Sequence, residues 1–119
     1  MPSRARLDEF IAAVESNDHA GAIERFYTED ASMQENANPP RVGRDVLVAH
    51  ERAFLATLSH VDSTAVTSVV EGDHVAINWV FEMTDTSGKV RKMDEVALQE
   101  WRGDKIFRER FFYDPSGRK

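Results

Sequence analysis

The sequence contains no cysteine, which excludes disulfide bonds and thiolate chemistry. It also lacks a long apolar run, so we expect neither a secretory signal segment nor a membrane-spanning helix. Basic residues are outnumbered: 15 Lys and Arg stand against 21 Asp and Glu, for a formal net charge of -6. This acidic excess argues against nucleic acid and anionic membranes as partners. On these absences we expect a cytoplasmic protein.

The composition that is present is that of an ordinary globular domain. The chain has 119 residues, of which 41% are hydrophobic and 30% charged, and this is enough for one domain with its own core. We find no zinc-ligand spacing, glycine-rich phosphate loop or nucleophile elbow. The sequence therefore predicts no resident metal and no cofactor.

The first half of the chain has helical periodicity. Three apolar stripes at three- and four-residue spacing predict three helices. Asp18 can cap the second helix, and the charge of Asp45 suits the first turn of the third. We expect a short strand at 31–35 and a loop at 36–43 between these two helices. The three stripes consist of Leu7, Phe10, Ile11 and Val14; of Ala22, Ile23, Phe26 and Tyr27; and of Val46, Leu47, His50, Phe54 and Leu58.

The second half changes to β-branched and aromatic residues. Hairpin-turn sequences at 71–73, 85–88 and 102–104 divide it into long segments. Helices followed by a meander of strands indicate an α+β fold, in which a bent antiparallel sheet wraps around the helices. The predicted strands are 61–70, 74–84, 90–101 and 105–113.

Two side chains stand out as a candidate acid/base pair. His50 lies on the apolar stripe of the third helix, and Glu35 ends the short strand before it. A carboxylate beside an imidazole in a pocket of low dielectric constant can transfer protons. Spacing alone also allows a buried neutral histidine and an exposed carboxylate. His19, His60 and His74 lie at the ends of predicted elements, and we expect them to be solvated.

Three segments, 22–31, 42–45 and 101–115, carry a resemblance to a known family. With the order and length of the elements, they resemble the nuclear transport factor 2-like superfamily, and most closely its SnoaL-like polyketide cyclases and ketosteroid isomerases. The resemblance covers nearly the whole chain. It implies a single domain over residues 1–119: a cone-shaped roll with three N-terminal helices packed on a strongly curved, mostly antiparallel β-sheet.

The resemblance also suggests roles for single residues. It places the general base of the isomerases at Glu35, with Asn36 as the alternative register. The oxyanion donors of the isomerases fall on Phe10 and Ala97, which cannot donate a hydrogen bond. The histidine and aspartate of the cyclases fall on Ala97 and Phe111, so that pair is absent as well.

The strand faces implied by the resemblance define a pocket. Val96 and Leu98 would point outward, and a homodimer through the convex sheet face would cover them. The opposite register, which would bury both and expose Glu95, is the alternative. The expected ligand-binding residues are Phe10, Tyr27, Phe54, Trp79, Glu95, Gln99, Phe107, Glu109, Phe111 and Tyr113.

The leading hypothesis is an acid/base enzyme, an isomerase, cyclase or hydrolase, that acts on a small hydrophobic, oxygenated metabolite. Glu35 would abstract a proton or activate water, and His50 would orient it or return the proton. Gln99 or Tyr113 would bind a developing oxyanion. The alternative is a non-catalytic module of the same fold that binds a ligand or a partner. A metal site built from Glu35, His50 and Glu109 is a third hypothesis.

Overall fold

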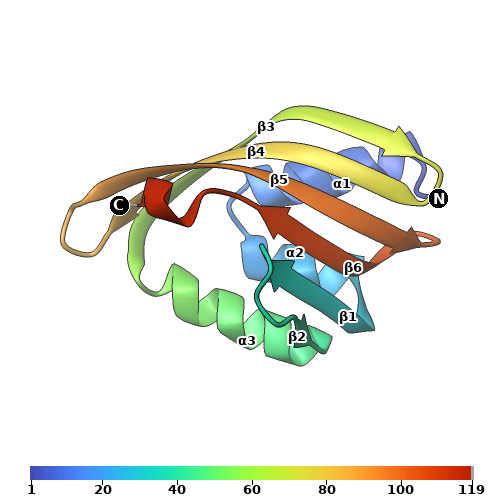
Figure 1. Cartoon of the computed structure of the whole chain (residues 1–119), viewed down its shortest axis with the longest axis horizontal. Helices are drawn as coiled ribbons and strands as arrows, with labels where there is room; N and C mark the ends of the chain where they lie inside the picture. Colours follow the sequence, from blue (N-terminus) through green and yellow to red (C-terminus); the bar gives the residue numbers. More distant parts are fainter. Residues whose placement is uncertain (119) are drawn as a thin grey trace.

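The computed structural model describes residues 1–118, and its helices and strands follow in the expected order (Figure 1). Among the described residues, none of the helices combines the length and the apolar character that a membrane span requires. The elements are α1 (Arg4–Glu15), α2 (His19–Phe26), β1 (Tyr27–Glu35), β2 (Arg41–Val42), α3 (Arg44–Leu55), β3 (Leu58–Glu71), β4 (His74–Asp85), β5 (Val90–Arg102), β6 (Lys105–Phe112) and the 3-10 helix η1 (Pro115–Arg118).

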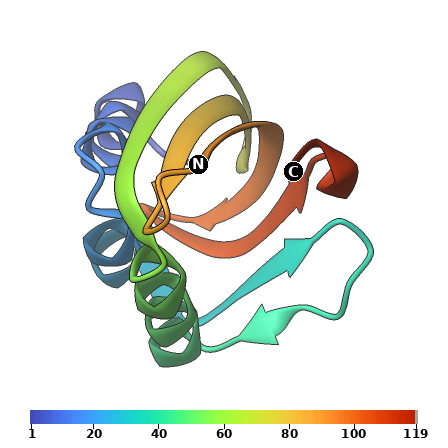
Figure 2. The same cartoon turned by 90° about the vertical axis from the view of Figure 1, so that its left-hand side faces the viewer.

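The strands form one sheet in the order β2-β1-β6-β5-β4-β3. β1 and β6 run parallel, and the other neighbouring pairs are antiparallel. Seen end on, the sheet curls strongly, and the helices lie together along one side of it (Figure 2). α3 packs against α2 and β1. The predicted architecture, three helices on a curved and mostly antiparallel sheet, is confirmed.

Local sequence explains where each helix begins. The Ser3 hydroxyl accepts a hydrogen bond from the Arg6 amide at the start of α1, and Asp18 accepts one from the Gly21 amide at 3.0 Å. A Cβ atom at Gly21 would lie 2.1 Å from the Asp18 carboxylate, so this cap requires glycine. α3 begins after Gly43, whose φ of 105° is a conformation that favours glycine. The predicted cap at Asp18 is confirmed.

The strand β1 begins earlier than predicted. We expected a strand from Ala31 and placed Tyr27 on the stripe of the second helix. Tyr27 instead has extended backbone angles, φ -107° and ψ 149°, and opens β1 directly after α2. The predicted loop also contains β2, which pairs with Ser32 and Met33. A strand of two residues carries no periodicity, which is why the sequence did not reveal it.

The helix α3 is rotated about its axis relative to the predicted stripe. Val46 and His50 were expected on the inward face, but both are exposed. Leu58, expected on the same stripe, begins β3. The buried residues of α3 are Leu47 and Val48. The face of α3 that packs inward is therefore centred on Leu47 and Val48, and the helix is rotated by about one residue relative to the prediction.

The strand β5 has the register implied by the resemblance. Glu95, Ala97 and Gln99 are buried on the concave face. Val96 and Leu98 point outward and are 42% and 43% exposed. The opposite register is wrong.

The strand β6 departs from simple alternation at Phe107. The pairing of β5 with β6 shifts by one residue at this point, which leaves Phe107 as the extra residue of a β-bulge. As a result Ile106 and Glu109 are both buried on the concave side. Phe107, which we expected in the pocket, lies instead against the guanidinium groups of Arg102 and Arg108, 4.5 and 5.4 Å from its ring centroid.

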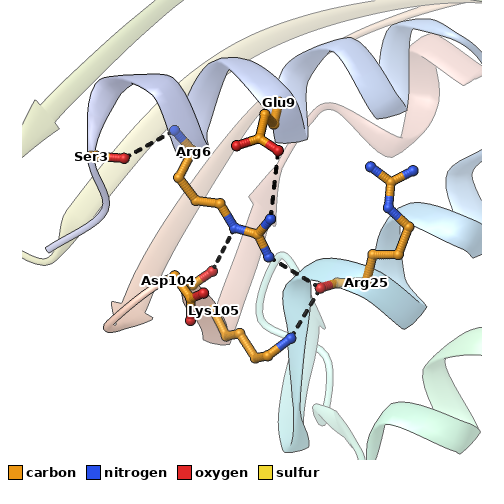
Figure 3. A network of polar contacts seen from close by, with 6 residues as sticks. All are labelled: Ser3, Arg6, Glu9, Arg25, Asp104 and Lys105. Carbon is orange, nitrogen blue, oxygen red and sulfur yellow. Dashed lines mark hydrogen bonds and ion pairs between the residues drawn. The ribbon is translucent and has the colours of Figure 1, made fainter.

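A group of cation–carbonyl contacts joins α1, the end of α2 and the β5–β6 turn (Figure 3). Arg6 Nε donates to the Asp104 carbonyl at 3.1 Å, and its Nη2 donates to the Arg25 carbonyl at 3.3 Å. Lys105 Nζ donates to the same Arg25 carbonyl at 3.1 Å. The Arg6 guanidinium also lies 4.1 Å from the Phe26 ring centroid. These cations satisfy carbonyl groups at a helix C-terminus and hold the helices to the sheet.

Candidate functional site

A cavity of about 510 Å³ lies between the helices and the concave face of the sheet. This volume is typical of sites that bind small molecules. Aromatic and aliphatic side chains make up most of its wall, with polar groups spaced among them. The lining residues are Phe10, Val14, His19, Ala22, Ile23, Tyr27, Met33, Glu35, Arg41, His50, Glu51, Ala53, Phe54, Val61, Trp79, Phe81, Met83, Met93, Glu95, Glu109 and Phe111.

Most of the residues predicted for the site line this cavity. They are Phe10, Tyr27, Glu35, His50, Phe54, Trp79, Glu95, Glu109 and Phe111. Gln99, Phe107 and Tyr113 lie outside the lining, and for these three the expected place in the pocket wall is wrong. Gln99 and Tyr113 still bear on the site, because each donates a hydrogen bond to a carboxylate that lines it.

A buried chain of hydrogen bonds runs beneath the cavity floor. The Tyr27 hydroxyl makes a short hydrogen bond to Glu109 Oε1, and Gln99 Nε2 donates to Glu109 Oε2 at 2.6 Å. The other end of the Gln99 amide accepts from Trp101 Nε1 at 3.0 Å. All four side chains are almost completely buried. Glu109 is thus held rigidly, and of the four side chains it and Tyr27 face the cavity.

Burial raises the pKa of Glu109 from 4.5 to about 7. The hydrogen bonds from Gln99 and Tyr27 act in the opposite direction, and the nearby charge of Glu51 raises the pKa slightly further. Burial, followed by the charge of Glu109, raises the pKa of Tyr27 well above 10. At neutral pH the Glu109 carboxyl therefore exchanges a proton readily, while the Tyr27 phenol keeps its own.

Glu35 is fixed at the edge of the cavity by two donors. Arg41 Nη1 donates to its Oε2 at 2.8 Å in an ion pair, and the Tyr113 hydroxyl donates to its Oε1 at 2.7 Å. The backbone amide of Tyr113 in turn donates to Asn36 Oδ1 at 3.1 Å. The Glu35 side chain is 27% exposed. We expected this carboxylate in a pocket of low dielectric constant, and the structure gives it a partly solvated environment.

The histidines are placed differently from the prediction. His50 lines the cavity but is exposed to solvent, whereas its neighbour Glu51 is half-buried. His19, expected to be solvated, is a pocket residue with a 13% exposed side chain. Its Nδ1 lies 3.5 Å from Glu51 Oε1, and its Nε2 lies 2.8 Å from Ser63 Oγ. The signal was present in the sequence, because His19 and Ile23 share the apolar stripe of α2.

Two aromatic rings line one wall of the cavity. Trp79 and Phe81 lie two residues apart on β4 and both face inward, as was expected for Trp79. Their rings are stacked, with centroids 5.7 Å apart and an interplanar angle of 18°. On the neighbouring strand, Glu95 pairs directly with Trp79. Other lining residues that the sequence analysis did not assign to the pocket include His19, Glu51, Arg41, Met33, Met83 and Met93.

Within residues 1–118 no group of three or more His, Asp or Glu side chains is arranged to hold a metal ion. Glu35, His50 and Glu109 all line the cavity, but they do not form such a group.

The chain resembles known proteins in sequence and in structure. Residues 7–109 match the model of the SnoaL-like domain. Similar solved structures include a protein from Catenulispora acidiphila with a ketosteroid isomerase-like fold, in complex with trimethylamine (19% identity, 98% of this chain and 90% of that one, TM-score 0.82). A candidate SnoaL-like polyketide cyclase from Mesorhizobium loti is also similar (24% identity, 95% of this chain and 100% of that one, TM-score 0.79).

A candidate isomerase from Bacillus subtilis has the same fold as well (18% identity, 95% of this chain and 86% of that one, TM-score 0.77). At these identities the structural likeness establishes the fold alone. No curated protein is significantly similar to this chain in sequence.

Proposed function

Because the chain belongs to the SnoaL-like domain family, we propose that its cavity binds a small, largely apolar, oxygenated molecule and catalyses proton transfer on it. One observation carries the proposal. Glu109 is a buried carboxyl group that faces an aromatic cavity, and its pKa is raised to about 7. A group with this pKa can give or accept a proton at neutral pH, as a general acid or base requires.

The geometry suggests a division of roles. Glu35, oriented by Arg41 and Tyr113, would accept a proton from a carbon next to a carbonyl group. When Glu109 carries its proton, its hydroxyl can donate a hydrogen bond to the Tyr27 oxygen, the reverse of the bond in the structure. The Tyr27 hydroxyl is then able to donate to a developing oxyanion in the cavity. Glu35 would release the abstracted proton to solvent, and His50, at the solvent-exposed edge, would deliver a proton from solvent to the product.

In this proposal Tyr27 takes the place of the oxyanion donors of the ketosteroid isomerases. The corresponding positions, Phe10 and Ala97, carry no donor. Tyr27 supplies a hydroxyl from a different strand, and Glu109 supports it. An isomerase or a cyclase, both of which proceed through an enolate, needs such a donor opposite its base.

A model ketone tests the catalytic proposal without knowledge of the natural substrate. Exchange of the acidic C–H protons of 2-tetralone for deuterium is followed by NMR. We expect the protein to accelerate exchange, and Glu35→Gln to lose about 10²-fold or more of that rate while probe affinity is kept. His60→Ala, a change at an exposed side chain outside the cavity, serves as the control. Equal loss of affinity and rate in Glu35→Gln would contradict a chemical role.

A non-catalytic binding module of the same fold is the second candidate. It is favoured by the contacts of Glu35, since both of its oxygens already accept hydrogen bonds from Arg41 and Tyr113. The related Catenulispora protein was solved with a small molecule, trimethylamine, which fits a binding role for this fold. Native mass spectrometry of the purified protein distinguishes the two. An unaltered molecule that stays bound, with no exchange on 2-tetralone, supports the binding module.

We further propose that the protein is a homodimer. Val96, Leu98 and Phe112 are 42%, 43% and 40% exposed, and the first two lie on the convex face of β5. A second copy of the chain would cover this apolar surface. The cytoplasmic location stays a prediction from the sequence.

A further inference from the structure

We propose that the molecule bound in this cavity carries a hydroxyl group, which donates a hydrogen bond to the carboxylate of Glu51 on α3. The inference rests on the proposed function, because it narrows the class of molecule that the cavity binds. It follows from the contacts of the carboxylates in the cavity wall and from the balance of charge around them.

Glu51 lines the cavity with only one of its carboxylate oxygens engaged. Its Oε1 lies 3.5 Å from His19 Nδ1, and within residues 1–118 its Oε2 has no hydrogen-bond or ion-pair partner. The side chain is 23% exposed and forms part of the wall. A ligand that displaces water from such an oxygen has to supply a donor in its place, since an unsatisfied carboxylate oxygen is costly.

The His19 ring holds this carboxylate in position. His19 Nε2 lies 2.8 Å from Ser63 Oγ, and Ser63 Oγ donates to Asn17 Oδ1 at 3.0 Å. The ring also packs edge-on against Phe81, with centroids 5.6 Å apart. Both ring nitrogens of His19 therefore face oxygen atoms of the chain, and the acceptor that remains for a ligand is Glu51.

The other carboxylates of the wall are already engaged. The oxygens of Glu35 and of Glu109 all accept hydrogen bonds within the chain. Glu95 also has an interaction partner within the chain. Of the carboxylates that line the cavity, Glu51 is therefore the acceptor best suited to a ligand donor.

The charges around the cavity favour a neutral donor over a cation. Arg41 is ion-paired with Glu35, and Arg91 places a positive charge on the same strand as Glu95. Glu109, with its pKa raised to about 7, is uncharged in a large share of the molecules at neutral pH. A bound cation is thus not needed to balance these groups, whereas a hydroxyl group adds no charge. The ionisable side chains of the wall are Glu35, Glu51, Glu95, Glu109, Arg41, His19, His50 and Tyr27.

Glu51 lies near the group proposed to bind the oxyanion. Its charge contributes to the raised pKa of both Tyr27 and Glu109, which face the same cavity. A ligand with a carbonyl oxygen at Tyr27 can therefore place a hydroxyl group at Glu51. A hydrogen bond to an ionised acceptor is stronger than one between neutral groups. The geometry thus favours hydroxy ketones among the oxygenated molecules that fit the cavity.

Hydroxylated forms of the model ketone test this inference. The affinities of 2-tetralone, of its isomers with one hydroxyl group on the aromatic ring, and of their methyl ethers are measured by isothermal titration calorimetry at pH 7. We expect one hydroxylated isomer to bind at least about tenfold more tightly than 2-tetralone, and its methyl ether to lose this gain. If no isomer binds more tightly than 2-tetralone, the hydroxyl inference is wrong and the proposed function stands. If none of the compounds binds, both are overturned.

Two matched substitutions locate the hydroxyl group. Glu51→Gln removes the ionised acceptor, and Glu24→Gln removes the same charge from an exposed side chain of α2 outside the cavity. We expect Glu51→Gln to weaken binding of the preferred isomer about tenfold and to leave 2-tetralone within about twofold. Glu24→Gln should change neither affinity. Equal weakening of both compounds by Glu51→Gln would mean that Glu51 only shapes the cavity, and would overturn the proposal. Thermal unfolding establishes that each variant is folded, and the methyl-ether comparison needs only the native chain.

Discussion

At the scale of single residues, Glu109 makes folding stability depend on pH. Its pKa is about 7 in the folded protein and near 4.5 when exposed, so the folded state holds the proton more tightly. The protonated form is therefore favoured by folding, and stability falls as pH rises from about 4.5 through 7. We expect a loss on the order of 3 kcal/mol from this group across that interval.

Denaturant unfolding at several pH values, compared between the native chain and Glu109→Gln, checks this prediction. A glutamine cannot titrate, so the variant should lack this part of the pH dependence even if its stability is lower throughout. The prediction fails if the two chains show parallel pH profiles between pH 5 and 8.

The hydroxyl of Tyr27 should stabilise the charged form of Glu109. This hydrogen bond lowers the carboxyl pKa, against the larger effect of burial. We therefore expect Tyr27→Phe to raise the Glu109 pKa further, as measured by NMR of the labelled carboxyl carbon across a pH titration. Tyr113→Phe removes a hydroxyl from Glu35 instead and should leave the Glu109 titration unchanged. A Glu109 pKa that falls in Tyr27→Phe would contradict the network.

The sequence was informative about Glu109 but misleading about His50. The family resemblance placed Glu109 in the pocket, yet its raised pKa depends on three-dimensional burial that no local pattern contains. For the histidine, a rotation of α3 by about one residue moved the inward position to Glu51. The predicted stripe did not include Val48, which is buried in the structure. It extends the apolar stripe on the Glu51 side of the helix.

At the scale of whole elements, the β-bulge in β6 decides which residues reach the cavity. The register implied by the resemblance, continued by strict alternation, predicted that Phe107, Glu109 and Phe111 would face inward together. The bulge at Phe107 lets Ile106 join the core while Glu109 and Phe111 keep their inward positions. Sequence periodicity does not reveal a bulge residue such as Phe107, because the pattern on either side of a bulge is still regular.

The contacts of Arg6 should matter more than those of a neighbouring arginine on the same helix. Arg6 donates to two carbonyl groups, those of Arg25 and Asp104, whereas Arg4 pairs with Asp8 and makes one exposed hydrogen bond, to the Ser68 hydroxyl. We expect Arg6→Ala to lower the free energy of unfolding by about 1–2 kcal/mol, because the hydrogen bonds to these two carbonyl groups and the contact with the Phe26 ring are lost. Arg4→Ala should cost less than about 0.5 kcal/mol. Chemical denaturation of both variants measures the difference, and equal losses would mean that the carbonyl contacts contribute little.

At the scale of the whole molecule, the architecture could be predicted and the chemistry of the site could not. Helical and strand periodicities are repeated over many residues, so single errors such as the early start of β1 at Tyr27 do not change the fold. The cavity is different, because it depends on a few positions. Arg41, on a strand of two residues, and His19, at the first position of a helix, both line it. Arg41 belongs to no repeated pattern, and the only signal for His19 is the stripe that it shares with Ile23, which is much weaker than the pattern that identified the sheet.

The last prediction concerns the association of two copies of the chain through the convex face of the sheet. If a second copy of the chain covers Leu98, replacing it with lysine should prevent association, because the charge would have to be buried at the interface. We expect light scattering after size exclusion to give a dimer mass for the native chain and a monomer mass for Leu98→Lys. Val46→Lys is the matched control, since Val46 is 52% exposed and lies on α3 rather than on β5. A native chain that stays monomeric as its concentration is raised would refute the dimer, and a dimer that tolerates Leu98→Lys would move the interface elsewhere.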